Sequence, residues 1–148
     1  RAWFDGPLAL GGAISTGGGV RAAQAMGADL AYIGSAFIAT DEARASDAYK
    51  QAIVDGTSDD IVYSSLFTGV HGNYLKPSIR NAGLDPDNLP ESHPTKMNFG
   101  GGEGSKKAWK DIWGCGQGIG AVKAVVPAAA LVDRLAREYG QARTRLAA

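Results

Sequence analysis

The sequence predicts an α/β fold with parallel strands, and three observations lead to that prediction. Two short apolar stretches, Leu8–Leu10 and Asp29–Ile33, have the length and composition of strands. Each is followed by glycine, and a stretch of helix-forming residues lies between them. Two strands joined by one helix form a βαβ unit, whose strands in one sheet must be parallel. We expect Leu8–Leu10 to be buried on both faces, as strands of parallel sheets usually are.

Two helices are expected before Gly56. Val20–Met26 is rich in helix-forming residues and ends at Gly27, a typical helix stop. Asp41–Val54 has alanine and isoleucine at roughly helical spacing and is followed by Gly56.

The pattern changes after Gly56, where few periodic stretches remain. Ile61–Tyr63 is expected to be a short extended piece, and Lys76–Ala82 a short helix that begins near Pro77. Asp85–Lys107 is expected to form a long surface excursion, which in a compact domain is usually a functional or covering segment.

Pro127–Ala142 is the clearest helix of the sequence, because proline suits a first turn and the stretch is amphipathic. Its expected apolar face consists of Leu131, Val132, Leu135 and Tyr139. The expected solvent face consists of Asp133, Arg134, Arg137 and Glu138.

Composition excludes several classes of function. The chain has 148 residues, and its 15 basic and 15 acidic residues cancel, so we expect neither a nucleic-acid nor a membrane partner. The single cysteine, Cys115, cannot form an internal disulfide, and no export signal is visible, so we expect a cytoplasmic protein. The 21 glycines are well above the average share and cluster, which indicates tight turns or ligand-contacting loops.

The glycines after the two strands suggest an anion site. Ligands of parallel α/β folds bind at the carboxyl ends of strands, and backbone N–H groups there can hold a phosphate without a cationic side chain. Gly11, Gly12 and Gly34 occupy these positions, although they could equally serve only to form tight turns. Neither a Rossmann fingerprint nor a P-loop is in register with the expected elements.

The stretch "GGAISTGGGVRAAQAMGADLAYIGSAFIATDEA" resembles the nitronate monooxygenase (2-nitropropane dioxygenase) family. Two later stretches, "FTGVHGNYLKPSI" and "AWKDIWGCGQGIGAV", also resemble segments of that family, in the same order. The family has a TIM barrel and depends on FMN. The resemblance implies that residues 1–56 are the last two βα units of such a barrel. Residues 57–148 would be an irregular and helical C-terminal extension.

By this resemblance the chain supplies the FMN phosphate site of an oxidoreductase that oxidises alkyl nitronates with O₂. The implied phosphate-binding amides are those of Gly12, Ala13, Gly34 and Ser35. Ala13 stands where the family usually has glycine, and it keeps its donor if its φ is negative. Gln117 and Gly118 are implied as further flavin contacts.

The resemblance leaves other functions open. Related enzymes on this scaffold reduce quinones with NADH or reduce enoyl thioesters. A non-catalytic phosphate- or nucleotide-binding α/β module is the remaining alternative.

No catalytic residue is assigned within the 148 residues. The family's histidine base and its first six strands correspond to sequence before Arg1, so we expect this chain alone to be inactive. The missing strands would then come from the rest of a longer chain, from another chain or from self-association. No spacing of His, Cys or Asp indicates a metal site.

Five further residues carry weaker signals. His71 and His93 are expected in loops or at the surface, and Cys115 as a small filler without a reactive thiolate. Trp109 and Trp113 are expected to anchor the C-terminal tail on the barrel.

Overall fold

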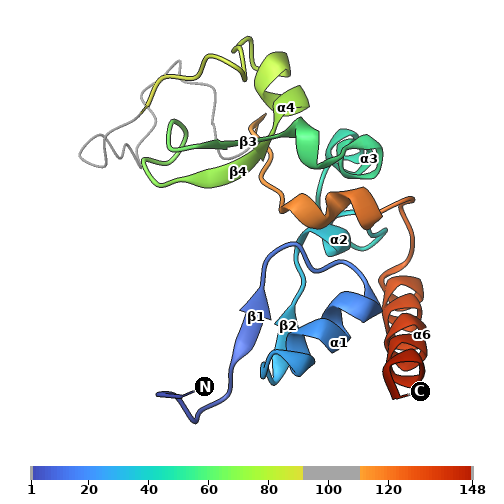
Figure 1. Ribbon diagram of the computed structural model, residues 1–148. Coiled ribbons are helices and arrows are strands. Elements are labelled where there is room, and N and C mark those ends of the chain that lie inside the picture. The colour runs from blue at the N-terminus through green and yellow to red at the C-terminus, as the bar shows by residue number, and fades with distance from the viewer. Residues whose placement is uncertain (1, 92–110, 148) are drawn as a thin grey trace.

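The computed structural model describes residues 2–91 and 111–147. Figure 1 shows two groups of elements with a short helix and a returning segment between them. The first group contains a parallel strand pair with two helices, and the second contains an antiparallel hairpin with two further helices. The α/β class predicted from the sequence is therefore confirmed. The partial barrel and the boundary at residue 56 stay predictions.

The parallel pair consists of β1 (Ala9–Gly11) and β2 (Leu30–Tyr32). Its register pairs Leu10 with Ala31, which confirms the expected βαβ unit. The expectation of burial on both faces is wrong, because Leu30 is 61% exposed and Tyr32 is 73% exposed. A sheet of two strands has two open edges, and among the described residues no further strand or helix covers its outer face.

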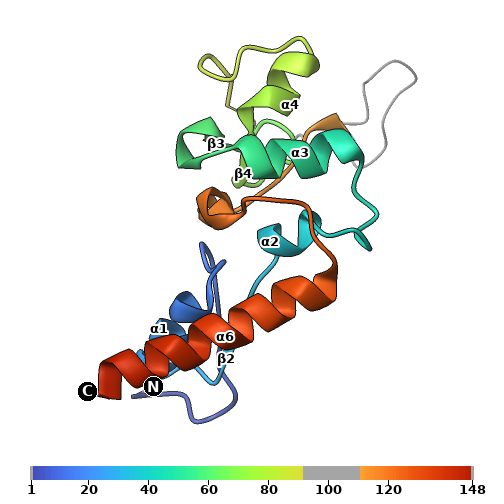
Figure 2. The ribbon, with the colours of Figure 1, turned by 90° about the vertical axis from the view of Figure 1, so that its right-hand side faces the viewer.

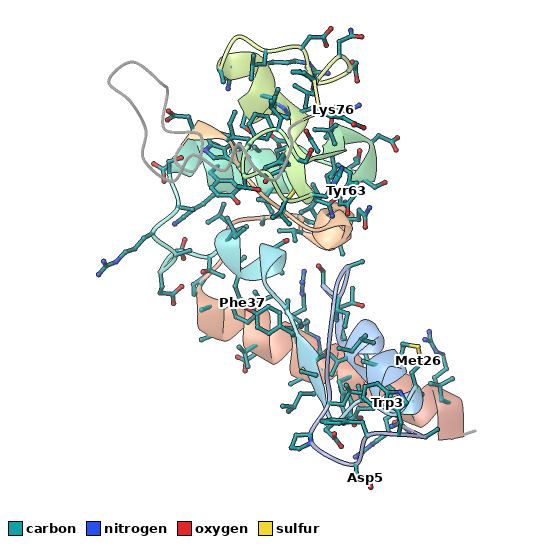
Figure 3. All side chains as sticks on the ribbon, turned by 90° about the vertical axis from the view of Figure 1, so that its left-hand side faces the viewer. Trp3, Asp5, Met26, Phe37, Tyr63 and Lys76 are labelled. Atoms are coloured by element: carbon teal, nitrogen blue, oxygen red, sulfur yellow. The ribbon has the colours of Figure 1, made fainter. Side chains whose placement is uncertain are left out.

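Exposure continues beyond the strands. Trp3 is 89% exposed and Met26 is 69% exposed, and Figure 3 shows both side chains at the same end of the molecule. Both of these large apolar side chains are therefore mostly in contact with water.

Helix α1 (Gly17–Ala25) begins three residues earlier than expected, because the Thr16 hydroxyl accepts a hydrogen bond from Gly19 N and caps it. Helix α6 (Ala128–Ala147) lies alongside α1 in both Figure 1 and Figure 2. The two backbones approach closely at Gly17, where a Cβ atom would lie 2.1 Å from the carbonyl oxygen of Leu135. Only glycine fits at this crossing.

The apolar face of α6 is narrower than expected. Leu131 is 3% exposed and Ala142 is 5% exposed, whereas Val132 is 51% exposed and does not belong to the buried face. Arg134 and Glu138, expected on the solvent face, point inward instead: Arg134 bonds to Ser15 in the loop before α1, and Glu138 bonds to Gly17 at the start of α1.

Two helices follow β2. Helix α2 (Ser35–Ile38) was not predicted from the sequence, and α3 (Asp47–Asp55) is shorter than the expected helix over Asp41–Val54. The helix begins later because the Ser46 hydroxyl accepts a hydrogen bond from Tyr49 N and sets the N-terminus. It ends at Gly56 as expected.

The second group is built on an antiparallel hairpin. The short 3₁₀ helix η1 (Ser58–Asp60) leads into β3 (Ile61–Ser64), which pairs with β4 (Gly72–Leu75). Strand β4 was missed in the sequence, because its four residues include a glycine and an asparagine, which strands disfavour. Helix α4 (Lys76–Asn81) follows with Pro77 in its first turn, as expected.

The segment 111–126 returns along both groups. Its backbone bonds to β4 through Leu75 N and Trp113 O at 2.8 Å, and to the residues after α2 through Asp41 N and Val126 O at 3.1 Å. Between these points lies the 3₁₀ helix η3 (Gln117–Ala121). This segment completes one buried core, which consists of Ala36, Ala39, Ile53, Leu75, Cys115, Ile119, Val122 and Leu131.

Two classes of feature are absent from the described ranges 2–91 and 111–147. No helix there combines the length and apolar character that crossing a lipid bilayer would need. No group of three His, Cys, Asp or Glu side chains there is arranged to hold a metal ion.

Candidate functional site

A pocket of about 200 Å³ lies where three backbone segments meet. The first segment follows β1, the second follows β2, and the third is the start of η3. The pocket is lined by Gly12, Ala13, Ile14, Ser15, Tyr32, Gly34, Ser35, Gly116 and Gly118. None of these side chains carries a charge at neutral pH, so backbone groups dominate the chemistry of the wall.

The loop after β1 has an unusual backbone. Gly12 has φ +107° and Ala13 has φ +54°, so both lie in the left-handed region. From the sequence, the Ala13 donor was expected to depend on a negative φ, and that condition is not met. An L-residue in this region costs roughly 1–2 kcal/mol, so glycine would adopt this conformation with less strain. The donor survives all the same, since alanine keeps its N–H in either conformation.

Three backbone N–H groups in the pocket wall are available to a ligand. Within residues 2–91 and 111–147, the N–H groups of Ala13, Gly34 and Ser35 have no hydrogen-bond acceptor. They come from the carboxyl ends of two neighbouring parallel strands. Backbone donors that converge from adjacent segments form an anion-binding site, since each carries a partial positive charge.

The third segment is fixed against the first two. The Ser35 hydroxyl oxygen accepts a hydrogen bond from Gly116 N at 2.7 Å. Gly118 lies directly against the first loop, because a Cβ atom there would be 2.7 Å from the Ala13 carbonyl oxygen and 2.6 Å from Ser15 Oγ. The structure thus explains glycine at position 118 by close approach.

Most of the sequence-predicted binding residues lie together. Five of the six line this pocket: Gly12, Ala13, Gly34, Ser35 and Gly118. Gln117 is the exception, because its side chain is exposed and it does not line the pocket. The role of all six in holding a flavin stays a prediction.

The remaining candidates lie elsewhere. His71 is exposed and stacks on Tyr63 with ring centroids 4.8 Å apart, in a hollow beside the β3–β4 hairpin rather than in the pocket. His93 and Trp109 lie outside the described residues. Trp113 stacks on Tyr49 of α3 at 5.1 Å, in agreement with an anchoring role for the tail.

Cys115 is a buried filler, as expected. It is 8% exposed, and burial raises the pKa of its thiol to about 12, so the thiolate is absent at neutral pH. Burial also raises the pKa of Tyr49 to about 12, and the neighbouring Cys115 adds to the shift. The Tyr49 hydroxyl donates a hydrogen bond to the Gly114 carbonyl.

Sequence reasoning missed two residues behind the pocket. Arg134 Nη2 donates to the Ser15 carbonyl oxygen at 3.1 Å, and Glu138 Oε2 accepts from Gly17 N at 2.8 Å. Their spacing of four along a helix was a usable signal, since such pairs face one side of a helix. The amphipathic pattern gave no reason to turn that side inward.

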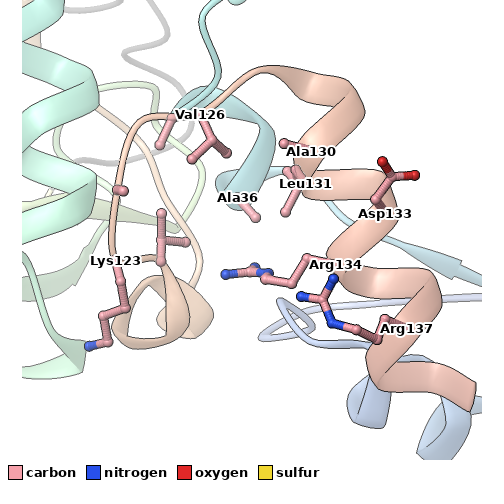
Figure 4. Close-up of a pocket in the computed structure, with 11 residues that line it drawn as sticks. Ala36, Lys123, Val126, Ala130, Leu131, Asp133, Arg134 and Arg137 are labelled. Atoms are coloured by element: carbon pink, nitrogen blue, oxygen red, sulfur yellow. The ribbon is translucent and has the colours of Figure 1, made fainter. Parts of the chain in front are cut away.

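A larger hollow of about 470 Å³ lies beside α6 and is separate from the pocket (Figure 4). Ala36 and Leu131 form part of its apolar wall, while Lys123, Arg134 and Arg137 approach it from opposite sides.

Comparisons with known proteins agree on one family. The family model described as nitronate monooxygenase matches residues 5–138. The chain is 28% identical over 140 residues to the nitronate monooxygenase of Paraburkholderia phytofirmans, covering 91% of this chain and 38% of that protein. The chain therefore spans well under half the length of this relative.

Solved structures of two enzymes resemble this chain in fold. The chain is similar to nitroalkane oxidase from Streptomyces ansochromogenes, with a TM-score of 0.72 and 30% identity, over 97% of this chain and 42% of that one. It is also similar to FabK from Thermotoga maritima, with a TM-score of 0.71 and 21% identity, over 97% of this chain and 47% of that one. At this identity the second likeness concerns the fold alone.

Proposed function

The chain belongs to the nitronate monooxygenase family, and from that premise we propose that it forms the FMN phosphate site of an oxidoreductase acting on alkyl nitronates. One observation carries the proposal: three unpaired backbone N–H groups line one pocket at the tips of two adjacent parallel strands. A phosphate is the part of FMN that such donors fit, because each N–H offers a hydrogen bond to an anionic oxygen.

The size of the pocket supports a role limited to the phosphate end. A volume of about 200 Å³ is below the roughly 300–1,000 Å³ that sites for whole small-molecule ligands occupy. The ring system of the flavin would therefore lie outside this pocket. Its contacts would come in part from chain segments that the 148 residues do not include.

The chemistry of the wall also fits a phosphate. Within residues 2–91 and 111–147 no acidic side chain lines the pocket, so none of the described lining residues repels a dianion. The Gly34 position is open, since a Cβ atom there would meet no other atom within 4 Å. Ser35 Oγ already accepts the Gly116 N–H, so its role is to hold the wall, with its hydroxyl proton still available to a ligand.

We further propose that additional parallel strands complete the sheet. Leu30 and Tyr32 are exposed although they belong to strands of a parallel pair, and parallel sheets are normally covered on both faces. A two-stranded sheet is also marginal by itself. Strands from the rest of a longer polypeptide, from another chain or from a second copy would cover these side chains and close a barrel.

Bound FMN would accept electrons from the nitronate and pass them to O₂. The 148 residues would hold the phosphate and fix the position of the cofactor, while the base that takes the substrate proton would lie in another part of the enzyme. A quinone or enoyl reductase, or a non-catalytic phosphate-binding module, remains an alternative that the same pocket would serve.

Substitution of Gly34 tests the site. Gly34→Val should weaken FMN binding at least tenfold, because the branched side chain would occupy the space of the phosphate without clashing with the chain itself. The backbone of Gly34, at φ −110° and ψ −62°, admits an L-residue, so the fold should persist. Fluorescence titration of the purified protein with FMN measures the effect.

Gly140→Val is the matched control, since it adds the same side chain into open space on α6, away from the pocket. The control should bind FMN as tightly as the unsubstituted protein. Equal FMN affinity for Gly34→Val and Gly140→Val would reject the phosphate site, and a protein that binds no FMN would reject the cofactor.

A further inference from the structure

Arg134 connects two of the three segments that form the pocket. From α6 its Nη2 atom donates to the Ser15 carbonyl oxygen at 3.1 Å, and its Nη1 atom lies 3.5 Å from the Ala121 carbonyl oxygen. Ser15 lies in the loop between β1 and α1, and Ala121 ends η3. One guanidinium therefore spans the two segments from behind, an arrangement that its planar, forked donors allow and a lysine could not reproduce.

Glu138 extends this connection by one helical turn. Its Oε2 atom accepts the Gly17 N–H at 2.8 Å, and its Oε1 atom lies 3.6 Å from Arg134 Nε. The Nε–Oε1 distance is within the range of an ion pair but long for a hydrogen bond. The pair thus holds both ends of the short stretch from Ser15 to Gly17, directly after the left-handed loop at Gly12 and Ala13.

Arg134 acts from outside the pocket. It does not belong to the residues that line the pocket, and it extends instead beside the separate hollow at α6 (Figure 4). Arg137 lies beside it in the same view, is exposed, and has no hydrogen bond to either loop among the described residues. The two arginines on one helix therefore differ in their attachment to the pocket.

The loop after β1 needs such a tether. A left-handed alanine is unfavourable, so the loop keeps its conformation only if surrounding contacts hold it. Ala13 lines the pocket, so the conformation of this loop sets where its N–H group lies. We propose that Arg134, supported by Glu138, is a positioning residue that sets the loop from Gly12 to Ser15 against η3 so that the backbone donors converge on a phosphate. This inference rests on the proposed function.

The proposal predicts a selective defect. Loss of the guanidinium would leave the Ser15 and Ala121 carbonyls and the Glu138 carboxylate without their shared partner. The loop would no longer be held in its position against η3, and the backbone N–H groups would no longer be aligned on the phosphate. The ring system of a flavin does not reach the pocket, so its binding would not change. The affinity ratio between FMN and riboflavin, which lacks the phosphate, isolates this defect.

The experiment compares Arg134→Ala, Arg134→Lys and Arg137→Ala by titration of the full protein with FMN and with riboflavin. Arg134→Ala should lower the preference for FMN about tenfold, the size expected when a charge-assisted hydrogen bond is lost. Arg134→Lys should recover part of the preference, because an ammonium keeps the charge and its donors but lacks the planar fork of the guanidinium. Arg137→Ala should change it by less than about twofold, within the spread of surface substitutions.

A purely structural role gives a different result. Global destabilisation lowers the folded fraction and weakens both ligands alike, so the ratio stays constant. Urea unfolding of each variant checks the folded fraction directly. Where Arg134→Ala does not fold, Glu138→Gln replaces it, since glutamine keeps an acceptor for Gly17 N–H but removes the charge facing Arg134; a smaller loss of FMN preference is expected.

The failures are distinguishable. If the unsubstituted protein binds FMN no better than riboflavin, the proposed phosphate site is wrong and this inference falls with it. If the unsubstituted protein prefers FMN and Arg134→Ala, or Glu138→Gln in its place, keeps the full preference, only the positioning role of Arg134 is overturned.

Discussion

The parallel pair β1–β2 and the antiparallel hairpin β3–β4 are both two-stranded, but they differ in burial. In the hairpin group, Leu75 and the neighbouring Ile79 of α4 are 0% exposed. In the parallel pair, Leu30 is 61% exposed and Tyr32 is 73% exposed. The hairpin group packs onto the shared core, whereas the parallel pair is covered chiefly on the side where α1 lies.

This difference in burial shows which apolar side chains of each region pack against other parts of the chain. The hairpin group completes its packing with α3 and the returning segment, which bonds to β4. The parallel pair has the apolar strand sequences of a sheet that is buried on both faces, but Leu30 and Tyr32 on its outer face are exposed. Its tips nevertheless form an ordered pocket, because the start of η3 and the helix α6 fix the loops from behind.

The largest expected effect is in the hairpin group. Ile79→Ala should lower the free energy of unfolding by about 3 kcal/mol, because it removes a fully buried side chain and leaves a cavity. Urea denaturation followed by circular dichroism measures the loss. A change below about 1 kcal/mol would contradict the assignment of Ile79 to a packed core.

A smaller effect of opposite sign is expected at the pocket loop. Ala13→Gly should raise the free energy of unfolding by about 1 kcal/mol, since glycine adopts φ +54° without the steric penalty that alanine meets. The same denaturation experiment applies. Destabilisation by Ala13→Gly would show that this residue does not have a left-handed conformation.

Leu30→Ser provides the contrast with Ile79. In the 148-residue chain it should change the free energy of unfolding by less than about 0.5 kcal/mol, because the side chain is mostly in water. A loss as large as that of Ile79→Ala would mean that the parallel pair is already covered, for instance by self-association. Sedimentation of both variants distinguishes that case.

The last expected effect is confined to alkaline pH and concerns Cys115 and Tyr49. Burial raises the pKa of Cys115 from 9.0 to about 12 and that of Tyr49 from 10.0 to about 12. Above the lower values the unfolded chain loses protons that the folded chain keeps, so stability is complete below pH 9.0 and falls as the pH rises toward 12. Cys115→Ala should reduce this decline, as measured by urea midpoints over that range. An unchanged decline would assign it to other groups.

Local signals were sufficient to predict the elements but not their environment. The parallel pairing follows from strand, helix and strand in sequence, and Gly56 correctly ends α3. The predicted start of α3 at Asp41 is wrong, because the Ser46 side chain caps the helix and sets its N-terminus after the helical pattern has already begun. Strand β4 has no strand signal of its own and exists because it pairs with β3 and the returning segment.

The candidate site was predictable to a similar degree. Glycine at strand ends located the loops of Gly12 and Gly34, and the family resemblance added Gly118. The positive φ of Ala13 could not be derived from a residue type that normally avoids it. The inward side of Arg134 depends on where α6 lies against α1, which is a long-range contact that no local pattern specifies.

The central claim is that the backbone amides at the tips of β1 and β2 bind a phosphate, and amide chemical shifts test it most directly. In ¹⁵N-labelled protein titrated with FMN, the Ala13, Gly34 and Ser35 amide resonances should shift together, as expected for unpaired N–H groups that gain an anionic acceptor. Riboflavin should leave these three resonances in place. Binding of FMN without movement of these amides, or equal movement with riboflavin, would contradict the account.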